Sequence, residues 1–208
     1  MKFLVLPFLL LFASGVHSVA GSANVSDDFD GIDFKNFSYP YRFSSGKYLN
    51  FRLKNGQYEY DFPNARGLVE LQHVYMADVT SDQRPEAIVM LLHATCGASC
   101  DGGSALFYIY SFRRGRLIPL WQYETGSFGY GCGLKSFSAK RGTMTFELFG
   151  RCSRRNQTDS SKGKFLVKDV TRLTFKSNGN SFVLRKRQFF SSPERDVRNY
   201  QPEFNVAH

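Results

Sequence analysis

The sequence predicts an all-β protein, an antiparallel meander that folds into a sandwich or an open barrel. Strand-like runs recur along the chain with turn residues between them, and apolar residues almost nowhere follow the helical period. Asn55-Gly56 separates two such runs as a tight hairpin turn does. Of the 208 residues, 42% are hydrophobic and 16% are aromatic, which excludes a disordered chain. We expect one β domain over residues 35–190.

The strands are expected in sequence order, each paired with the next. We predict strands at Lys47–Leu53, Gln57–Phe62, Leu68–Ala77, Ala87–Thr95, Ala105–Phe112, Leu117–Glu124, Leu134–Ala139, Thr143–Phe149, Lys164–Lys176 and Ser181–Gln188. Ala87–Thr95 is apolar on both faces, which is typical of a central buried strand. Ser192-Pro193-Glu194 has the pattern of a helix start, so residues 191–208 are predicted to form a short helix or a tail.

The N-terminal residues have the three-part pattern of a secretory signal peptide over residues 1–20. Lys2 is followed by an apolar run at residues 3–12 and by the small residues Ser18-Val19-Ala20. We therefore expect a secreted protein, extracellular or periplasmic, with no membrane span. Residues 21–34 read as an acidic linker or arm. Three triplets fit the glycosylation pattern, at Asn24, Asn36 and Asn156.

Four cysteines are present in a chain that we expect to be exported, so disulfides are predicted. In an up-and-down meander alternate loops lie at the same end, and this places Cys96, Cys100, Cys132 and Cys152 at one end. Cys132 and Cys152 face each other across the open end of a hairpin, which favours the local pairing Cys132–Cys152 with Cys96–Cys100. A crossed pairing and a zinc site are the alternatives.

Oxygen-bearing side chains alternate along residues 78–86, the spacing that a calcium loop uses. Asp78, Thr80, Asp82 and Glu86 offer side chains and Arg84 its carbonyl, so Ca²⁺ is the cofactor to consider, if there is one. Thr80 stands where Asp or Asn is usual, and Gln83 where the turn requires glycine. The alternative is a turn in which Asp and Thr side chains bond backbone amides.

This acidic loop is similar to the calcium loop of FG-GAP repeats, and the chain resembles a family of uncharacterised secreted bacterial proteins. The resembling stretches are Ile32–Tyr41, Asp78–Met90, Gly103–Tyr110, Leu120–Gly126, Gly133–Gly142 and Phe146–Gly150. A single copy of the loop cannot build a propeller, because blades must repeat. In that family the loop usually has glycine after each acidic step, where this chain has Ser81 and Gln83. The resemblance implies export and a single β domain, without an assigned activity.

No convergent set of catalytic residues is readable in the sequence, so we do not expect an enzyme. His93 lies in the most apolar strand and is interpreted as a hydrogen-bonded core histidine rather than a base. The serine-hydrolase elbow, the HExxH zinc motif and the phosphate-binding loop are all missing. A hydrolase without a readable motif is retained as an alternative.

The balance of 27 Lys+Arg against 18 Asp+Glu, a net charge of +9, favours an anionic partner. In the meander, Arg113, Arg114, Arg116, Lys140 and Arg141 share one end, and Arg154 and Arg155 lie near the other, where Phe128 and Tyr130 sit among glycines. We predict a secreted interaction module that binds an anionic polymer or a protein through loops at one end. Nucleic acid is not expected. An extracellular structural or assembly subunit is the first alternative; the sequence leaves the oligomeric state open.

Overall fold

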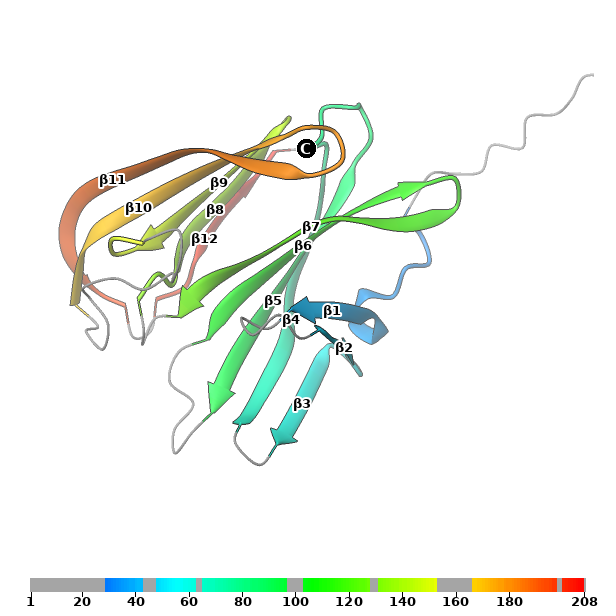
Figure 1. Cartoon of the computed structure of the whole chain (residues 1–208), viewed down its shortest axis with the longest axis horizontal. Helices are drawn as coiled ribbons and strands as arrows, with labels where there is room; N and C mark the ends of the chain where they lie inside the picture. Colours follow the sequence, from blue (N-terminus) through cyan, green and yellow to red (C-terminus); the bar gives the residue numbers. More distant parts are fainter. Residues whose placement is uncertain are drawn as a thin grey trace, which may run out of the picture.

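The chain is described from a computed structural model (Figure 1). The structure describes residues 29–42, 48–62, 65–96, 103–127, 131–152, 166–197 and 200–207. Strands dominate these ranges, and the helical element among them is one short 3-10 turn, η1 (Phe34–Asn36). The all-β prediction is therefore confirmed. The predicted signal peptide at 1–20 lies outside the described residues, as do Asn24, Asn156, Cys100, Phe128, Tyr130, Arg154 and Arg155.

The first sheet is an antiparallel meander of five strands that follow one another in the sequence. Its strands are β3 (Gln57–Phe62), β4 (Ala65–Ala77), β5 (Glu86–Cys96), β6 (Ser104–Arg113) and β7 (Arg116–Ser127). The Asn55-Gly56 turn leads into β3 with φ values of 53° and 89°, the left-handed pair that a tight hairpin turn requires. The tight turn is confirmed, but the predicted hairpin is not: one isolated bridge, Lys54–Gln57, closes the turn, while residues 48–52 pair with 38–42 and β3 pairs with β4.

The second sheet contains another meander and one strand that joins it from the C-terminus. Its strands are β8 (Leu134–Lys140), β9 (Thr143–Phe149), β10 (Leu166–Ser177), β11 (Phe182–Asp196) and β12 (Glu203–Val206). They are ordered β11-β10-β9-β8-β12, so the chain passes from one edge of the sheet to the other after β11 (Figure 1). β12 pairs with β8 in parallel, whereas the other neighbours are antiparallel.

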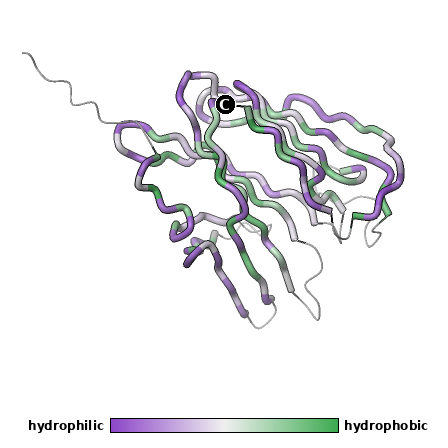
Figure 2. Tube along the Cα trace, turned by 180° about the vertical axis from the view of Figure 1, so that it is seen from behind, coloured by the Kyte–Doolittle hydropathy of each residue, from purple (hydrophilic) through white to green (hydrophobic). Residues whose placement is uncertain are grey.

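A hairpin of β1 (Ser38–Arg42) and β2 (Tyr48–Arg52) and the second sheet lie on opposite sides of the first sheet (Figure 1). One core forms between the two sheets, and a second forms between the first sheet and the hairpin. β5 serves both, because Ile88 and Met90 enter the first core while Val89 and Leu91 enter the second. This explains why the strand is apolar on both faces, as predicted. In Figure 2, which colours the chain by hydropathy, the edge strand β3 is more hydrophilic than the central strand β5.

The packed sheets form a sandwich, one of the two arrangements that the sequence predicts. Aromatic rings from both sheets meet in the core between them. Phe107 of β6 packs on Phe137 of β8 with ring centroids 4.8 Å apart, and Trp121 of β7 packs on Phe175 of β10 at 4.9 Å. These contacts position the two sheets relative to each other and so fix which connecting turns meet at their ends.

The predicted C-terminal helix is wrong. Ser192, Pro193 and Glu194 lie within β11, which continues to Asp196. Pro193 is tolerated there because β11 is an edge strand and the register shifts between Val167 and Asp169 of its partner, so no ladder hydrogen bond needs its missing N–H. The sheet therefore extends beyond residue 190, and part of the predicted tail forms β12.

The described part of the predicted arm, residues 29–34, packs on the domain. Phe29 and Phe34 are 6% and 7% exposed and belong to the core under the β1–β2 hairpin. Asn36, a predicted glycosylation position, uses its side chain locally: Nδ2 donates to Asp33 at 2.7 Å, and Oδ1 accepts from the Asn55 amide at 2.9 Å. In the described residues, no helix has the length and apolar character needed to cross a membrane.

Candidate binding site

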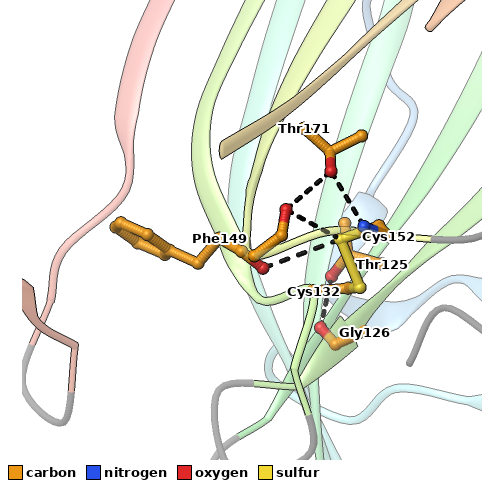
Figure 3. The surroundings of a disulfide bond; sticks show 7 residues. Thr125, Gly126, Cys132, Phe149, Cys152 and Thr171 are labelled. Atoms are coloured by element: carbon orange, nitrogen blue, oxygen red, sulfur yellow. Dashed lines mark hydrogen bonds between the residues drawn. A yellow bond between two sulfur atoms is a disulfide. The ribbon is translucent and has the colours of Figure 1, made fainter. Parts of the chain in front are cut away.

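The disulfide Cys132–Cys152 closes the open end of the β8–β9 hairpin, as the sequence predicts (Figure 3). The two Cα atoms are 5.7 Å apart, and both residues are buried. Thr171 of β10 anchors the bridge, because its hydroxyl accepts from the Cys152 amide at 2.8 Å and donates to the Gly150 carbonyl at 2.6 Å. A disulfide leaves no thiolate to bind zinc, so the zinc alternative does not apply to this pair. The side chains of Cys96 and Cys100 lie outside the described residues.

The acidic loop between β4 and β5 is held by hydrogen bonds from its carboxylates to its own backbone. Asp78 accepts from the amides of Asp82 at 3.1 Å and Gln83 at 3.2 Å, and Asp82 accepts from the Arg84 amide at 3.0 Å. These contacts match the hydrogen-bonded turn that is the alternative to a calcium loop. They leave the two aspartates with partners before any ion is considered.

Glu86 lies beneath the loop with its side chain fully buried. One carboxylate oxygen accepts from the amides of Val79 and Thr80 at 3.0 and 3.1 Å, and the other from the Thr80 hydroxyl at 3.1 Å. Burial raises the pKa of Glu86 to about 6, although the hydrogen bonds from Thr80 and Val79 act in the opposite direction. The carboxylate therefore fastens the loop to the start of β5.

Two residues of the loop adopt the left-handed backbone conformation without being glycine. Ser81 has φ of 68° and Gln83 has φ of 70°. A side chain is strained in this region, because its Cβ approaches the following carbonyl oxygen. These are the positions at which the FG-GAP-like pattern has glycine. Ser81 and Gln83 therefore adopt a backbone conformation that glycine adopts without strain.

The acidic loop joins basic turns of both sheets. Asp82 forms an ion pair with Arg113 at 3.1 Å, at the β6–β7 turn, and Asp78 forms one with Arg141 at 3.4 Å, at the β8–β9 turn. The approach is close: a Cβ added at Gly142 would lie 2.6 Å from the Ser81 hydroxyl. These contacts put Arg113–Arg116 and Lys140–Gly142 at one end of the molecule, as the meander predicts. We call this the loop end: residues 78–86, 113–116 and 140–142.

Acidic and basic residues meet at the loop end, which was not predicted from the sequence. The same alternation of loops that places the two basic turns together also places the loop before β5 there, and that signal was available. Asp78 and Asp82 neutralise two of the five predicted cations. Arg114, Arg116 and Lys140 are exposed and form no ion pair within the described part of the chain.

A second cluster, which the sequence did not predict, lies under the β1–β2 hairpin. His93 of β5 is 2.8 Å from the Tyr60 hydroxyl through Nε2 and 3.4 Å from Glu124 through Nδ1. Glu124 also accepts from Ser104 at 2.7 Å and from Tyr41 at 3.0 Å. The adjoining cavity has about 20 Å³, which is room for roughly one water molecule. This network ties the hairpin to the sheet, and His93 is hydrogen-bonded as expected.

The loop end thus carries three exposed cations on turns that two ion pairs connect to the acidic loop. Comparisons with known protein families, with curated proteins and with solved structures gave no match to this chain. The resemblance to secreted bacterial proteins with an FG-GAP-like loop therefore stays a prediction.

Proposed function

We propose that this protein is a secreted, non-catalytic interaction module that binds an anionic polymer or an acidic protein through its loop end. One observation carries the proposal: the acidic loop pins basic turns from two different sheets together and leaves Arg114, Arg116 and Lys140 exposed without ion pairs among the described residues. The ion pairs already fix the turns, so binding needs to order only the three side chains and not the backbone that carries them.

The ion pairs to the acidic loop make the geometry of the loop end specific. Asp78 and Asp82 hold Arg141 and Arg113, and these contacts orient the turns that carry the remaining three cations. A uniformly basic surface would attract any polyanion, whereas acidic residues among the cations repel anions that are placed elsewhere. We infer a partner whose anionic groups are spaced to meet the three exposed cations.

Binding to a heparin column at physiological salt tests the proposal. The variant Arg114→Ser/Arg116→Ser/Lys140→Ser should lose affinity by roughly tenfold or more, since each cation contributes about 1 kcal/mol at an anionic surface. The control Lys54→Ser/Lys168→Ser/Arg185→Ser removes the same charge from exposed positions outside the loop end. Equal loss of retention in both variants would reduce the interaction to net charge and contradict a site at the loop end.

The edge strand β11 supports the alternative proposal of an assembly subunit. β11 has fifteen residues, lies at the edge of its sheet, and exposes Val183, Phe189 and Phe190 by 40%, 53% and 36%. Long edge strands with exposed apolar side chains invite pairing with another chain. Sedimentation of the protein over a hundredfold concentration range tests this: a monomer throughout contradicts assembly, and a dimer that Phe189→Lys abolishes supports it.

A further inference from the structure

The outer face of the second sheet forms an open groove of about 710 Å³. It is large enough for a ligand of ordinary size. Side chains of all five strands β8–β12 line it, and ten of the twelve lining residues are polar or charged. The groove is separate from the loop end, and none of its lining residues belongs to that site.

The strand register arranges these polar side chains in two straight rows across the sheet, which we call the first and the second rung. The first rung runs through the register partners Lys186, Thr174, Thr145, Ser138 and Asn205. The second rung runs through Gln188, Arg172, Glu147, Ser136 and Glu203. Neighbouring strands lie about 4.8 Å apart, so each rung is about 19 Å long, and the rungs are about 7 Å from each other.

The side chains of the first rung are all available to a ligand. None of the five forms a hydrogen bond or ion pair within the described part of the chain. They comprise three hydroxyls, one amide and one ammonium group. Hydroxyls and amides can both donate and accept hydrogen bonds, so the row matches a ligand whose groups do the same.

The second rung is held in place by a network around Glu147. Its carboxylate accepts from Lys135 at 2.6 Å, from Ser136 at 3.1 Å, and from Arg172 at 2.6 and 3.0 Å. Burial raises the pKa of Glu147, but the hydrogen bonds from Lys135 and Arg172 outweigh it and lower the pKa overall. Glu147 therefore stays ionised and gives the groove a rigid floor.

The charges among the lining residues balance, which decides the class of ligand. Arg172 and Lys186 are opposed by Glu147 and Glu203. Such a groove has no strong preference for an anion or a cation, while its charged groups remain good hydrogen-bond partners for neutral hydroxyls. This contrasts with the loop end, where the exposed cations outnumber the free carboxylates.

Aromatic residues lie beyond the second rung, outside the residues that line the groove. Tyr200 packs on Phe149 with ring centroids 4.8 Å apart, where the chain crosses toward β12. Phe190 of β11 is 36% exposed and has the Arg172 guanidinium 4.7 Å from its ring centroid. The guanidinium covers one face of the Phe190 ring, so the contact with a ligand is assigned to the hydrogen-bonding rows and not to ring stacking.

We propose that the groove binds a neutral linear oligosaccharide that lies across the strands, with its hydroxyls hydrogen-bonded to the first rung. The length of the rung sets the extent of the contact, so a short oligosaccharide saturates it. The site is independent of the loop end: it requires no anionic group, and its binding should not weaken with salt, unlike ion-pair binding.

The test uses the full mature chain labelled with ¹⁵N and titrated with a panel of neutral oligosaccharides: cellohexaose, xylohexaose, mannohexaose, maltohexaose and chitohexaose. We expect amide shifts confined to β8–β12 for at least one of them, unchanged between 50 and 500 mM salt. The variant Thr145→Val/Thr174→Val removes two hydroxyls while keeping side-chain shape, and should weaken that binding about fivefold or more. Thr143→Val, on the same strand but outside the lining, is the matched control.

Three results would overturn the proposal. The first is no shift with any member of the panel. The second is a set of shifts at residues 78–86, 113–116 or 140–142, which would assign the ligand to the loop end. The third is equal weakening by Thr143→Val and by the double variant, which would remove the first rung from the contact. The triple variant of the loop end changes no residue that lines the groove. Failure of the oligosaccharide proposal can therefore be distinguished from failure of the anion-binding proposal.

Discussion

The hydroxyl of Tyr60 lies 2.8 Å from Nε2 of His93, although the whole of β4 separates their strands. The ring can reach across because its register partner on β4, Gly67, has no side chain. Nδ1 of His93 lies 3.4 Å from the carboxylate of Glu124, so the imidazole is held between the two residues. A glycine in a strand interior thus permits a hydrogen bond between two strands that are not neighbours.

Gly67→Ala should destabilise the protein by about 2 kcal/mol or more, because overpacking of this kind forces the structure to shift. The added Cβ would lie 2.3 Å from the Tyr60 ring and 2.6 Å from the carbonyl oxygen of Ala94. Urea unfolding monitored by tryptophan fluorescence gives the free energy. In a Tyr60→Ala background the same substitution should cost less, since one of the two clashes is gone. An identical loss of stability in both backgrounds would contradict the position of the Tyr60 ring over Gly67.

Ten of the strands β1–β12 coincide with predicted runs, because their signals are local, whereas β1 and β12 were not predicted. Asn55-Gly56 specifies its turn whatever lies around it, and the two apolar faces of β5 record two separate cores. Pro193 led to a wrong prediction because the same residues can begin a helix or occupy a bulge on an edge strand. Only the position of β11 in the folded protein distinguishes the two structures. The parallel pairing of β12 has no local signal, since it depends on a chain crossing over the end of the sheet.

Gln83→Gly should stabilise the protein by about 0.5–1 kcal/mol, since it relieves left-handed strain that exceeds the entropy cost of glycine. The φ of 70° at Gln83 is the reason, and the amide that donates to Asp78 is retained. Thermal or urea unfolding measures the change. Glu59→Gly, at an exposed and regularly paired position in the interior of β3 without positive φ, is the control and should lower stability. Loss of stability in both variants would mean that the loop backbone is unstrained.

Glu86 should make stability depend on pH in a defined window. Its pKa in the folded protein is about 6, above the ordinary value of 4.5, so between these values the folded state binds more protons than the unfolded state. This residue therefore adds stability as the pH is lowered from 7 to about 4.5, on the order of 2 kcal/mol. Glu147 acts oppositely, because its pKa is lowered and its contribution is lost in more acidic solution.

The comparison with Glu86→Gln isolates this residue from the others. Unfolding free energies of both proteins are measured by urea titration between pH 4.5 and 7.5. The unfolding free energy of the wild type minus that of the variant should increase as the pH falls, because only the wild type gains a proton at position 86. A difference that shrinks over this range would reverse the sign of the shift and so contradict the raised pKa.

The loop end could be predicted only in part. The alternation of loops placed the basic turns together correctly, but side-chain pairing depends on distances that a strand order does not supply. The ion pair between Arg141 and Asp78 joins residues of different sheets, and so depends on how the sandwich packs. The same holds for the two rungs, since they align only through the register of five strands.

Calcium provides a direct test of the acidic loop. Asp78 and Asp82 already bind backbone amides and arginines, and both oxygens of Glu86 accept hydrogen bonds from Val79 and Thr80. An ion would have to break these contacts, so the melting temperature should not change between millimolar calcium and a chelator. A rise of several degrees with calcium, abolished by Asp78→Asn, would instead support the calcium interpretation.

Removal of the Cys132–Cys152 disulfide should cost about 3 kcal/mol, the value typical of a bridge that closes a short loop. The two residues are 20 apart in the sequence, and both are buried against β10. We expect Cys132→Ala/Cys152→Ala to unfold at lower urea concentration. Mass spectrometry of unreduced peptides checks the pairing itself, since a peptide that links Cys132 to Cys96 or Cys100 would contradict it.

The Thr171 hydroxyl bonds the Cys152 amide rather than its sulfur, so Thr171→Val should destabilise the hairpin end even when the bridge is intact.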